Sequence, residues 1–143
     1  MRILGIDHGT KRIGLALSDE LQMIAQPFDF FPAEPFVEFL ARLEELIREK
    51  SVEQIVIGMP RNMNGTYGPA TDKVKKFIEQ LKETIQVPIR AWDERLTSVE
   101  ANRLLIQGNV RREKRKEKVD KMAAAILLQS FLDSQQVNLS ESE

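Results

Sequence analysis

The order of the apolar segments along the chain most constrains the fold. Residues Arg2–Asp7 and Arg12–Ser18 form two short apolar segments on either side of the turn residues Gly9-Thr10-Lys11. Two such segments joined by a short glycine-containing turn predict an antiparallel β-hairpin. A weaker third strand is expected over Pro27–Phe31. The chain therefore begins with strands, before any helical periodicity.

After the hairpin, expected helices and strands alternate. Phe36, Leu40, Leu43 and Ile47 recur at helical spacing, which predicts an amphipathic helix over residues 33–50. The other expected elements are a buried strand at Gln54–Gly58, a loop at Met59–Pro69, a helix marked by apolar residues from Val74 to Ile85, a strand at Val87–Trp92, a short helix from Thr97 to near Gly108 and a final apolar helix at Val119–Leu132. This order predicts a three-layer α/β domain with a mixed five-stranded sheet and helices on both faces.

Length and composition exclude several classes of protein. With 143 residues the chain fits one domain, expected over residues 1–136, followed by a polar, acidic tail at 137–143 that frays. The absence of cysteine excludes a disulfide scaffold and a zinc–thiolate site, and a single histidine, His8, is too few for a multi-histidine metal centre. The longest apolar run, Met122–Leu128, is too short for a membrane span, so we expect a cytoplasmic protein.

Charge is unevenly distributed along the chain. The formal net charge is −1, yet the segment Arg111–Lys121 holds seven lysines and arginines against three acids. Such a cluster indicates a surface that faces a polyanion, although a solvated helix face has the same pattern. Lys11 and Arg12, at the tip of the expected hairpin, are further candidates for phosphate contacts.

Acidic residues stand at the ends of apolar elements. Asp7 closes the first strand, Asp93-Glu94 close the strand before them, and Asp120 precedes the last apolar helix. Carboxylates that converge at one sheet edge repel each other unless a cation lies between them, and hard oxygen ligands suit Mg²⁺ or Mn²⁺. Two such ions can promote phosphodiester hydrolysis without histidine or cysteine. The alternative is that these acids only cap or solvate element ends.

Period-two alternation assigns some of these side chains to faces of the sheet. It places Ile3, Gly5 and Asp7 on one face and His8 on the other, so His8 is expected to be structural or peripheral. The same alternation separates Asp93 from Glu94, so only one of them can be a direct metal ligand. Gly5, Gly9 and Gly14 either leave room for ions and a phosphate or serve ordinary turn chemistry.

Four sequence blocks resemble the YqgF (RuvX) family. The first is Gly5-Ile6-Asp7-His8-Gly9-Thr10-Lys11-Arg12-Ile13-Gly14-Leu15-Ala16-Leu17-Ser18-Asp19, and the second is Gly58-Met59-Pro60 with Asn64-Gly65 and Gly68. The third is Asp93-Glu94-Arg95-Leu96-Thr97-Ser98, and the fourth is Lys118-Val119-Asp120-Lys121-Met122-Ala123-Ala124-Ala125-Ile126-Leu127-Leu128-Gln129, ending with Phe131-Leu132-Asp133. The blocks occur in order over residues 2–133. The resemblance implies an RNase H-like fold, shared with RuvC-type junction resolvases, and a nuclease that matures the 5′ end of pre-16S ribosomal RNA.

The resemblance also implies roles for individual residues. Asp7, Glu94 and Asp120 would be the catalytic acids and the ligands of Mg²⁺ or Mn²⁺, with Asp93 in reserve for the middle position. The further acid of RuvC-type enzymes is absent, since Ala123 stands three residues after Asp120. The expected nucleic-acid contacts are Lys11, Arg12, Arg95, Arg111, Arg112, Lys114, Arg115, Lys116 and Lys118.

Three other functions remain open at this point. A Holliday junction resolvase would use the same fold and acids, and would need a homodimer to cut two strands. A processing nuclease is compatible with a monomer, and the ribosome would be its partner. A non-catalytic nucleic-acid-binding factor would keep the basic residues alone. An ATP-handling protein shares the pattern Asp7-His8-Gly9-Thr10 with a later Gly14, but would need a second such domain.

Overall fold

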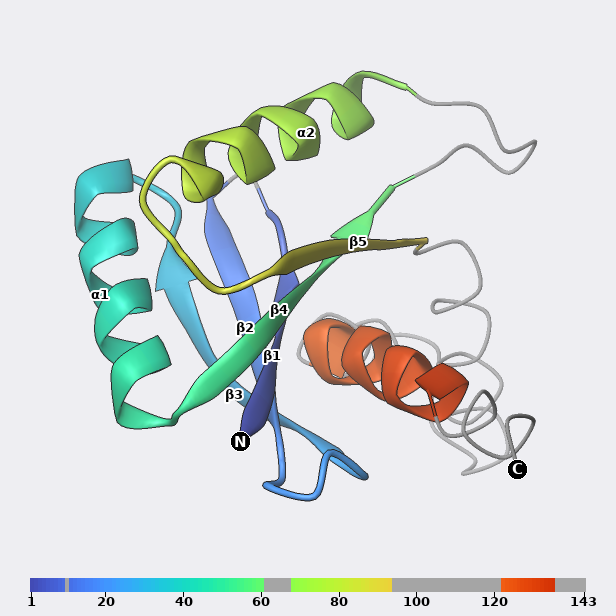
Figure 1. The fold of residues 1–143 in the computed structure, drawn as a ribbon. Helices are drawn as coiled ribbons and strands as arrows, with labels where there is room; N and C mark the ends of the chain where they lie inside the picture. The colour runs from blue at the N-terminus through green and yellow to red at the C-terminus, as the bar shows by residue number, and fades with distance from the viewer. Residues whose placement is uncertain (10, 61–67, 94–121, 136–143) are drawn as a thin grey trace.

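The computed structural model describes residues 1–9, 11–60, 68–93 and 122–135 (Figure 1). The strands are β1 (Arg2–Asp7), β2 (Arg12–Ser18), β3 (Ala25–Pro32), β4 (Val52–Met59) and β5 (Ile89–Asp93). The labelled helices are α1 (Phe36–Glu49) and α2 (Pro69–Lys82), and a further helix at residues 122–135 is called the C-terminal helix. The predicted alternation of helices and strands is therefore confirmed.

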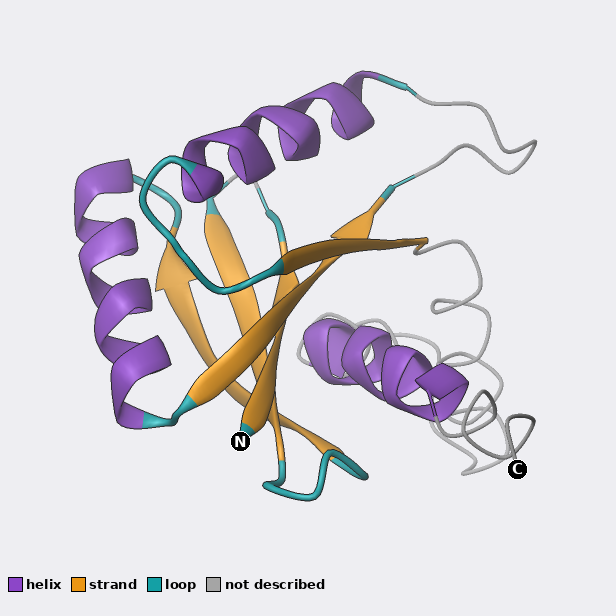
Figure 2. Cartoon of the chain, in the orientation of Figure 1, coloured by secondary structure: helices purple, strands orange, loops and turns teal. Residues whose placement is uncertain are grey.

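The five strands form one mixed sheet in the order β3-β2-β1-β4-β5 (Figure 2). β1 pairs with β2, and β2 with β3, in antiparallel fashion, which confirms the predicted opening hairpin. β1 pairs with β4, and β4 with β5, in parallel. In the chain, α1 connects β3 to β4, and α2 connects β4 to β5. β1 thus lies at the centre of the sheet, with its carboxyl end at the same edge as those of β4 and β5.

The two faces of the sheet carry separate hydrophobic clusters. On one face, Leu4 and Ile6 of β1 pack with α1 and α2 residues that include Phe39, Leu43 and Phe77. The other face carries the C-terminal helix, whose buried residues pack against Ile3, Ala16 and Val56. In Figure 1 this helix lies across the sheet from α1 and α2. The three-layer arrangement with helices on both faces is therefore confirmed.

Several element boundaries differ from the predicted ones. α2 begins at Pro69, before the apolar periodicity starts at Val74, because Gly68 and Pro69 suit the N-cap and first helical positions. β5 begins at Ile89 rather than Val87, since Pro88 has no N–H for a strand ladder. Both β3 and β4 are longer than predicted, and α1 is shorter. The C-terminal helix continues to residue 135, beyond the predicted end at Leu132.

Some predicted features lie outside the described residues. These are the helix from Thr97 to near Gly108, the basic segment Arg111–Lys118, the start of the final helix at Val119 and the acidic tail. None of the helices within the described ranges is long and apolar enough to cross a membrane.

Candidate active site at the carboxyl end of β1

Asp7 is the last residue of the central strand and is half-buried. Alternation places it on the same face as Gly5 and Ile3, which is the face covered by the C-terminal helix. A Cβ built on Gly14, its partner in β2, would lie 3.7 Å from the Asp7 Cβ, so the two positions share this face. Asp7 therefore lies at the carboxyl end of the central strand, on the sheet face that it shares with Ile3 and Gly5, as the alternation predicted.

Gly5 allows the C-terminal helix to approach the sheet. A Cβ built on Gly5 would lie 2.9 Å from the Cβ of Leu128 and 3.1 Å from the carbonyl oxygen of Ala124. Any larger side chain would push the helix away from β1. The missing side chain at Gly5 therefore makes room for this helix, a role that differs from both of those considered from the sequence.

The other two glycines have different surroundings. A Cβ on Gly9 would lie 2.3 Å from the carbonyl oxygen of Arg12, which is a constraint of the tight turn. Gly14 and Gly58 lie on the two strands that flank β1. Gly14 of β2 pairs with Asp7. Gly58 of β4 directly follows Ile57, which pairs with Ile6, the residue before Asp7. Neither glycine has a side chain, and the Phe30 ring of β3 lies against the Gly14 position, 3.3 Å from a Cβ built there.

His8 lies on the opposite face, as predicted from the alternation. Its ring packs against Phe77 of α2, with 4.6 Å between ring centroids and 48° between planes. Burial lowers the pKa of His8 below its ordinary value; the Asp7 carboxylate opposes this shift, and Lys73 adds to it. The imidazole is therefore part of the α2 side of the sheet rather than of the acidic site.

Asp93 also lies on the opposite face from Asp7. It pairs with Met59, which belongs to the cluster under α1 and α2. Its neighbour Trp92 contacts the C-terminal helix, with its ring 5.3 Å from that of Phe131 and its Nε1–H donating to the Ser130 Oγ at 3.2 Å. The reserve candidate for the middle acid is therefore placed away from Asp7.

The remaining predicted acids, Glu94 and Asp120, lie outside the described residues. Among the residues that are described, no group of three or more acidic or histidine side chains could hold a metal ion. Of the predicted acids, Asp7 and Asp93 are the two that the structure describes, and the strand pairing places them on opposite faces of the sheet.

The predicted basic contacts are partly described. Lys11 and Arg12 are exposed at the β1–β2 turn. The Arg12 guanidinium lies 4.6 Å from the ring centre of Phe30 in β3. This contact was missed from the sequence, because Phe30 falls beside Arg12 only through the pairing of β2 with β3. The other expected contacts, Arg95, Arg111, Arg112, Lys114, Arg115, Lys116 and Lys118, lie outside the described residues.

Comparison with known proteins decides the family. The model of the RuvX family, described as Holliday junction resolvase, matches residues 1–134. The chain belongs to the RuvX family. A relative from Desulforamulus reducens is 52% identical over 134 residues, covering 94% of this chain and 98% of its own. Another, from Caldanaerobacter subterraneus subsp. tengcongensis, is 49% identical over 136 residues, covering 94% and 98%. Both are named "Putative pre-16S rRNA nuclease".

Solved structures resemble this RuvX chain in fold. RuvC from T. thermophilus, in complex with a Holliday junction substrate, matches with a TM-score of 0.54 at 16% identity, covering 95% of this chain and 96% of RuvC. The fowlpox virus Holliday junction resolvase matches with the same score and identity, covering 94% and 99%. These likenesses confirm the predicted RNase H-like, RuvC-type fold.

Proposed function

We propose that this protein is a metal-dependent endonuclease that cuts structured RNA and processes the 5′ end of pre-16S ribosomal RNA in the cytoplasm. The observation that carries the proposal is the position of Asp7, at the carboxyl end of the central strand and on the face of the C-terminal helix. Membership of the RuvX family and the names of the relatives support the reaction and the substrate.

The residues at this edge suit a hard divalent cation. Asp7 offers carboxylate oxygens, and Gly14 and Gly58 leave the neighbouring strand positions without side chains. In the proposal, Asp7, Glu94 and Asp120 would hold Mg²⁺ or Mn²⁺. Such an ion supplies positive charge to phosphate oxygens and acidifies water. The protein residues would fix the ligand geometry, and the flanking glycines would admit the phosphodiester.

The choice of Glu94 as the middle acid follows from β5. Trp92 contacts the C-terminal helix, and Asp93 lies on the other face beside Met59. If the alternation continues for one residue, Glu94 returns to the face of Asp7. On this basis we retain Glu94, rather than Asp93, as the proposed ligand.

Asp120 is the proposed third acid. The described C-terminal helix starts at residue 122, and Ala124, in its first turn, contacts the Gly5 position of β1. The first turn of this helix thus lies at the β1 strand that ends in Asp7, and Asp120 precedes that turn by two residues in the sequence. Asp120 would complete the carboxylate set from that side.

The test is cleavage of a pre-16S 5′-leader RNA with Mg²⁺ or Mn²⁺. Asp7→Asn should lower the cleavage rate by on the order of 10³-fold or more, because it removes a negatively charged metal ligand, while RNA binding persists. Chelation by EDTA should abolish cleavage by the unaltered protein. Glu45→Gln, the same carboxylate-to-amide change on an exposed position of α1, should leave the rate unchanged. Cleavage that survives both EDTA and Asp7→Asn would contradict the proposal.

A second candidate, a Holliday junction resolvase, is favoured by the family description and by the RuvC fold. A four-way DNA junction in the same assay separates the two. Paired symmetric nicks in the junction, without RNA cleavage, would assign the resolvase, and light scattering should then show a homodimer. Binding of either substrate without any cutting would assign a non-catalytic binding factor.

A further inference from the structure

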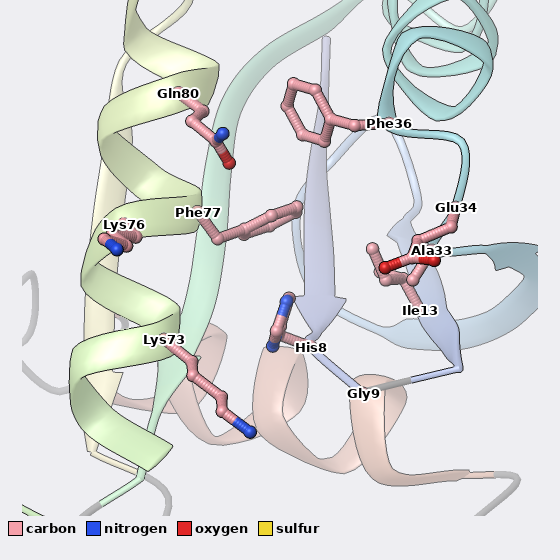
Figure 3. Close-up of a pocket in the computed structure, with 10 residues that line it drawn as sticks. All are labelled: His8, Gly9, Ile13, Ala33, Glu34, Phe36, Lys73, Lys76, Phe77 and Gln80. Atoms are coloured by element: carbon pink, nitrogen blue, oxygen red, sulfur yellow. The ribbon is translucent and has the colours of Figure 1, made fainter. Parts of the chain in front are cut away.

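A hollow of about 490 Å³ lies on the α2 side of the sheet, next to the proposed active site (Figure 3). His8 and Gly9, which directly follow Asp7, form one boundary of it. One wall comes from α2 and the other from the segment between β3 and α1, together with Ile13 of β2. Its volume falls within the range of about 300–1,000 Å³ that is usual for small-ligand sites.

The lining combines aromatic and charged groups. Phe77 projects from α2 between Phe36 and His8, as Figure 3 shows, with 6.3 Å between the Phe36 and Phe77 ring centroids. Lys73 and Lys76 contribute two positive charges from the same helix. The rings of His8 and Phe36 are half-buried and lie at angles of 48° and 83° to the buried Phe77 ring. Aromatic surface beside ammonium groups suits a ligand that has both a planar ring and a phosphate.

The other polar groups also suit such a ligand. Gln80 extends from α2 toward the hollow, and its amide can both donate to and accept from a base edge. Glu34 stands on the opposite wall, where its carboxylate can accept hydrogen bonds from ribose hydroxyls or amino groups. A purely hydrophobic ligand would leave all these groups without partners on burial.

The walls of the hollow are held in place by packing. The Thr71 side chain is buried, and its hydroxyl donates to the carbonyl of Pro60, which joins the start of α2 to the end of β4. Phe77 is 4% exposed and packs against Phe39. The lysines thus project from a helix that is anchored on the sheet.

We infer that this hollow binds a nucleotide, with the base against the half-buried rings of His8 and Phe36 and the phosphate on Lys73 and Lys76. The inference deepens the proposed function and rests on it in one respect: an RNA strand that places a phosphate at Asp7 passes the adjacent His8–Gly9 segment. An unpaired nucleotide of that strand can then enter the hollow. A free mononucleotide has the same chemistry, so the experiment separates these two sources.

The test uses the His8 ring, because it is the only histidine in the sequence and so gives a single set of imidazole signals in a proton NMR spectrum. The intact protein is titrated in EDTA with AMP, adenosine, ribose 5-phosphate and inorganic phosphate. AMP should shift the His8 signals in a saturable way, and ligands that lack the base or the phosphate should bind more weakly. No shift with AMP, or an equal response to inorganic phosphate, would overturn the inference.

Two matched variants locate the site. Lys73→Glu should weaken AMP binding about tenfold or more, since it replaces an attractive charge with a repulsive one. Lys82→Glu makes the same change at an exposed position of α2 that does not line the hollow, and should alter the affinity less than twofold. Equal losses in the two variants would show only a general charge effect and would overturn the assignment.

A second experiment decides whether the bound nucleotide belongs to an RNA strand or is a free mononucleotide. It compares two RNAs in the same buffer: a fully paired duplex and that duplex with one bulged nucleotide. Preference for the bulged RNA, lost in Lys73→Glu but kept in Lys82→Glu, assigns the hollow to the RNA substrate. AMP binding without this preference assigns it to a free nucleotide. Because EDTA prevents metal-dependent cleavage, these readouts are separate from the test of the nuclease. Loss of cleavage activity alone therefore does not decide the nucleotide site.

Discussion

At the scale of single residues, Gly5 sets the distance between the central strand and the C-terminal helix. We expect Gly5→Ala to lower the free energy of unfolding by about 1–3 kcal/mol, because the new methyl meets both the Leu128 Cβ and a helix carbonyl at Ala124. Urea denaturation, followed by the fluorescence of Trp92, measures this loss. The tryptophan is a suitable probe because it contacts Phe131 of the same helix.

Gly14→Ala is the matched control for this prediction. Its new methyl would lie 3.3 Å from Cε1 of the Phe30 ring and 3.7 Å from the Asp7 Cβ. Both neighbours are side-chain atoms, and the Phe30 ring lies on the edge strand β3, so this neighbour can move. The loss of stability should therefore be clearly smaller than at Gly5. Equal losses at the two positions would contradict the close helix approach as the cause.

At the scale of elements, Gln129 joins the C-terminal helix to the β2–β3 connection and to the first residue of β3. Its Oε1 accepts from the Ala25 N–H at 2.8 Å, and its Nε2 donates to the Met23 carbonyl at 3.1 Å. Nε2 also donates to Asp133 Oδ1 at 2.9 Å within the helix. These bonds tie together segments about a hundred residues apart in the sequence.

Gln129→Ala removes these bonds and should lower the stability of the protein by about 1–3 kcal/mol, since the Ala25 N–H is left without this acceptor in a half-buried site. Hydrogen exchange should quicken most in the C-terminal helix and at Ala25. Gln129→Glu serves as the control: it keeps an acceptor for Ala25 and loses the donor, so its exchange rates should change less at Ala25. A uniform increase in hydrogen-exchange rates throughout the sheet would contradict a local stabilising role for the Gln129 hydrogen bonds.

The elements themselves were largely predictable from apolar periodicity. The alternation in β1 correctly placed His8 and Asp7 on opposite faces, because strand residues alternate whatever packs on them. Boundaries were less predictable. α2 starts at Pro69, where capping rather than periodicity decides, and its early residue Thr71 is a buried polar group that no apolar pattern marks.

At the scale of the whole molecule, the site was only partly predictable. The position of Asp7 at the end of the first strand followed from the sequence, whereas the face on which Asp93 lies required the register that pairs it with Met59. The hollow beside His8 was not predicted, since Lys73 and Glu34 come from separate elements that only the folded sheet brings together. Pairing between distant segments is therefore the information that single-segment patterns lacked.

The charge distribution leads to the last prediction. With a net charge of −1, the protein as a whole has little attraction for RNA, so binding should depend on local clusters such as Arg111–Lys118. Replacing Arg112 and Arg115 by Gln should weaken binding of the leader RNA. The slope of log K against log salt concentration should fall in magnitude by about 0.7 for each single-strand phosphate contact that is lost. Fluorescence anisotropy of a labelled leader RNA across a salt series measures both quantities.

The control removes the same number of charges elsewhere. Arg48 and Lys82 lie in the last turns of α1 and α2, are exposed, and are remote in sequence from the basic segment. If the cluster carries the affinity, Arg48→Gln with Lys82→Gln leaves the salt slope unchanged although the net charge becomes equally more negative. If both pairs of substitutions flatten the slope alike, the contacts are spread over the surface. The basic segment would then be an ordinary solvated region, and recognition would depend on the site around Asp7.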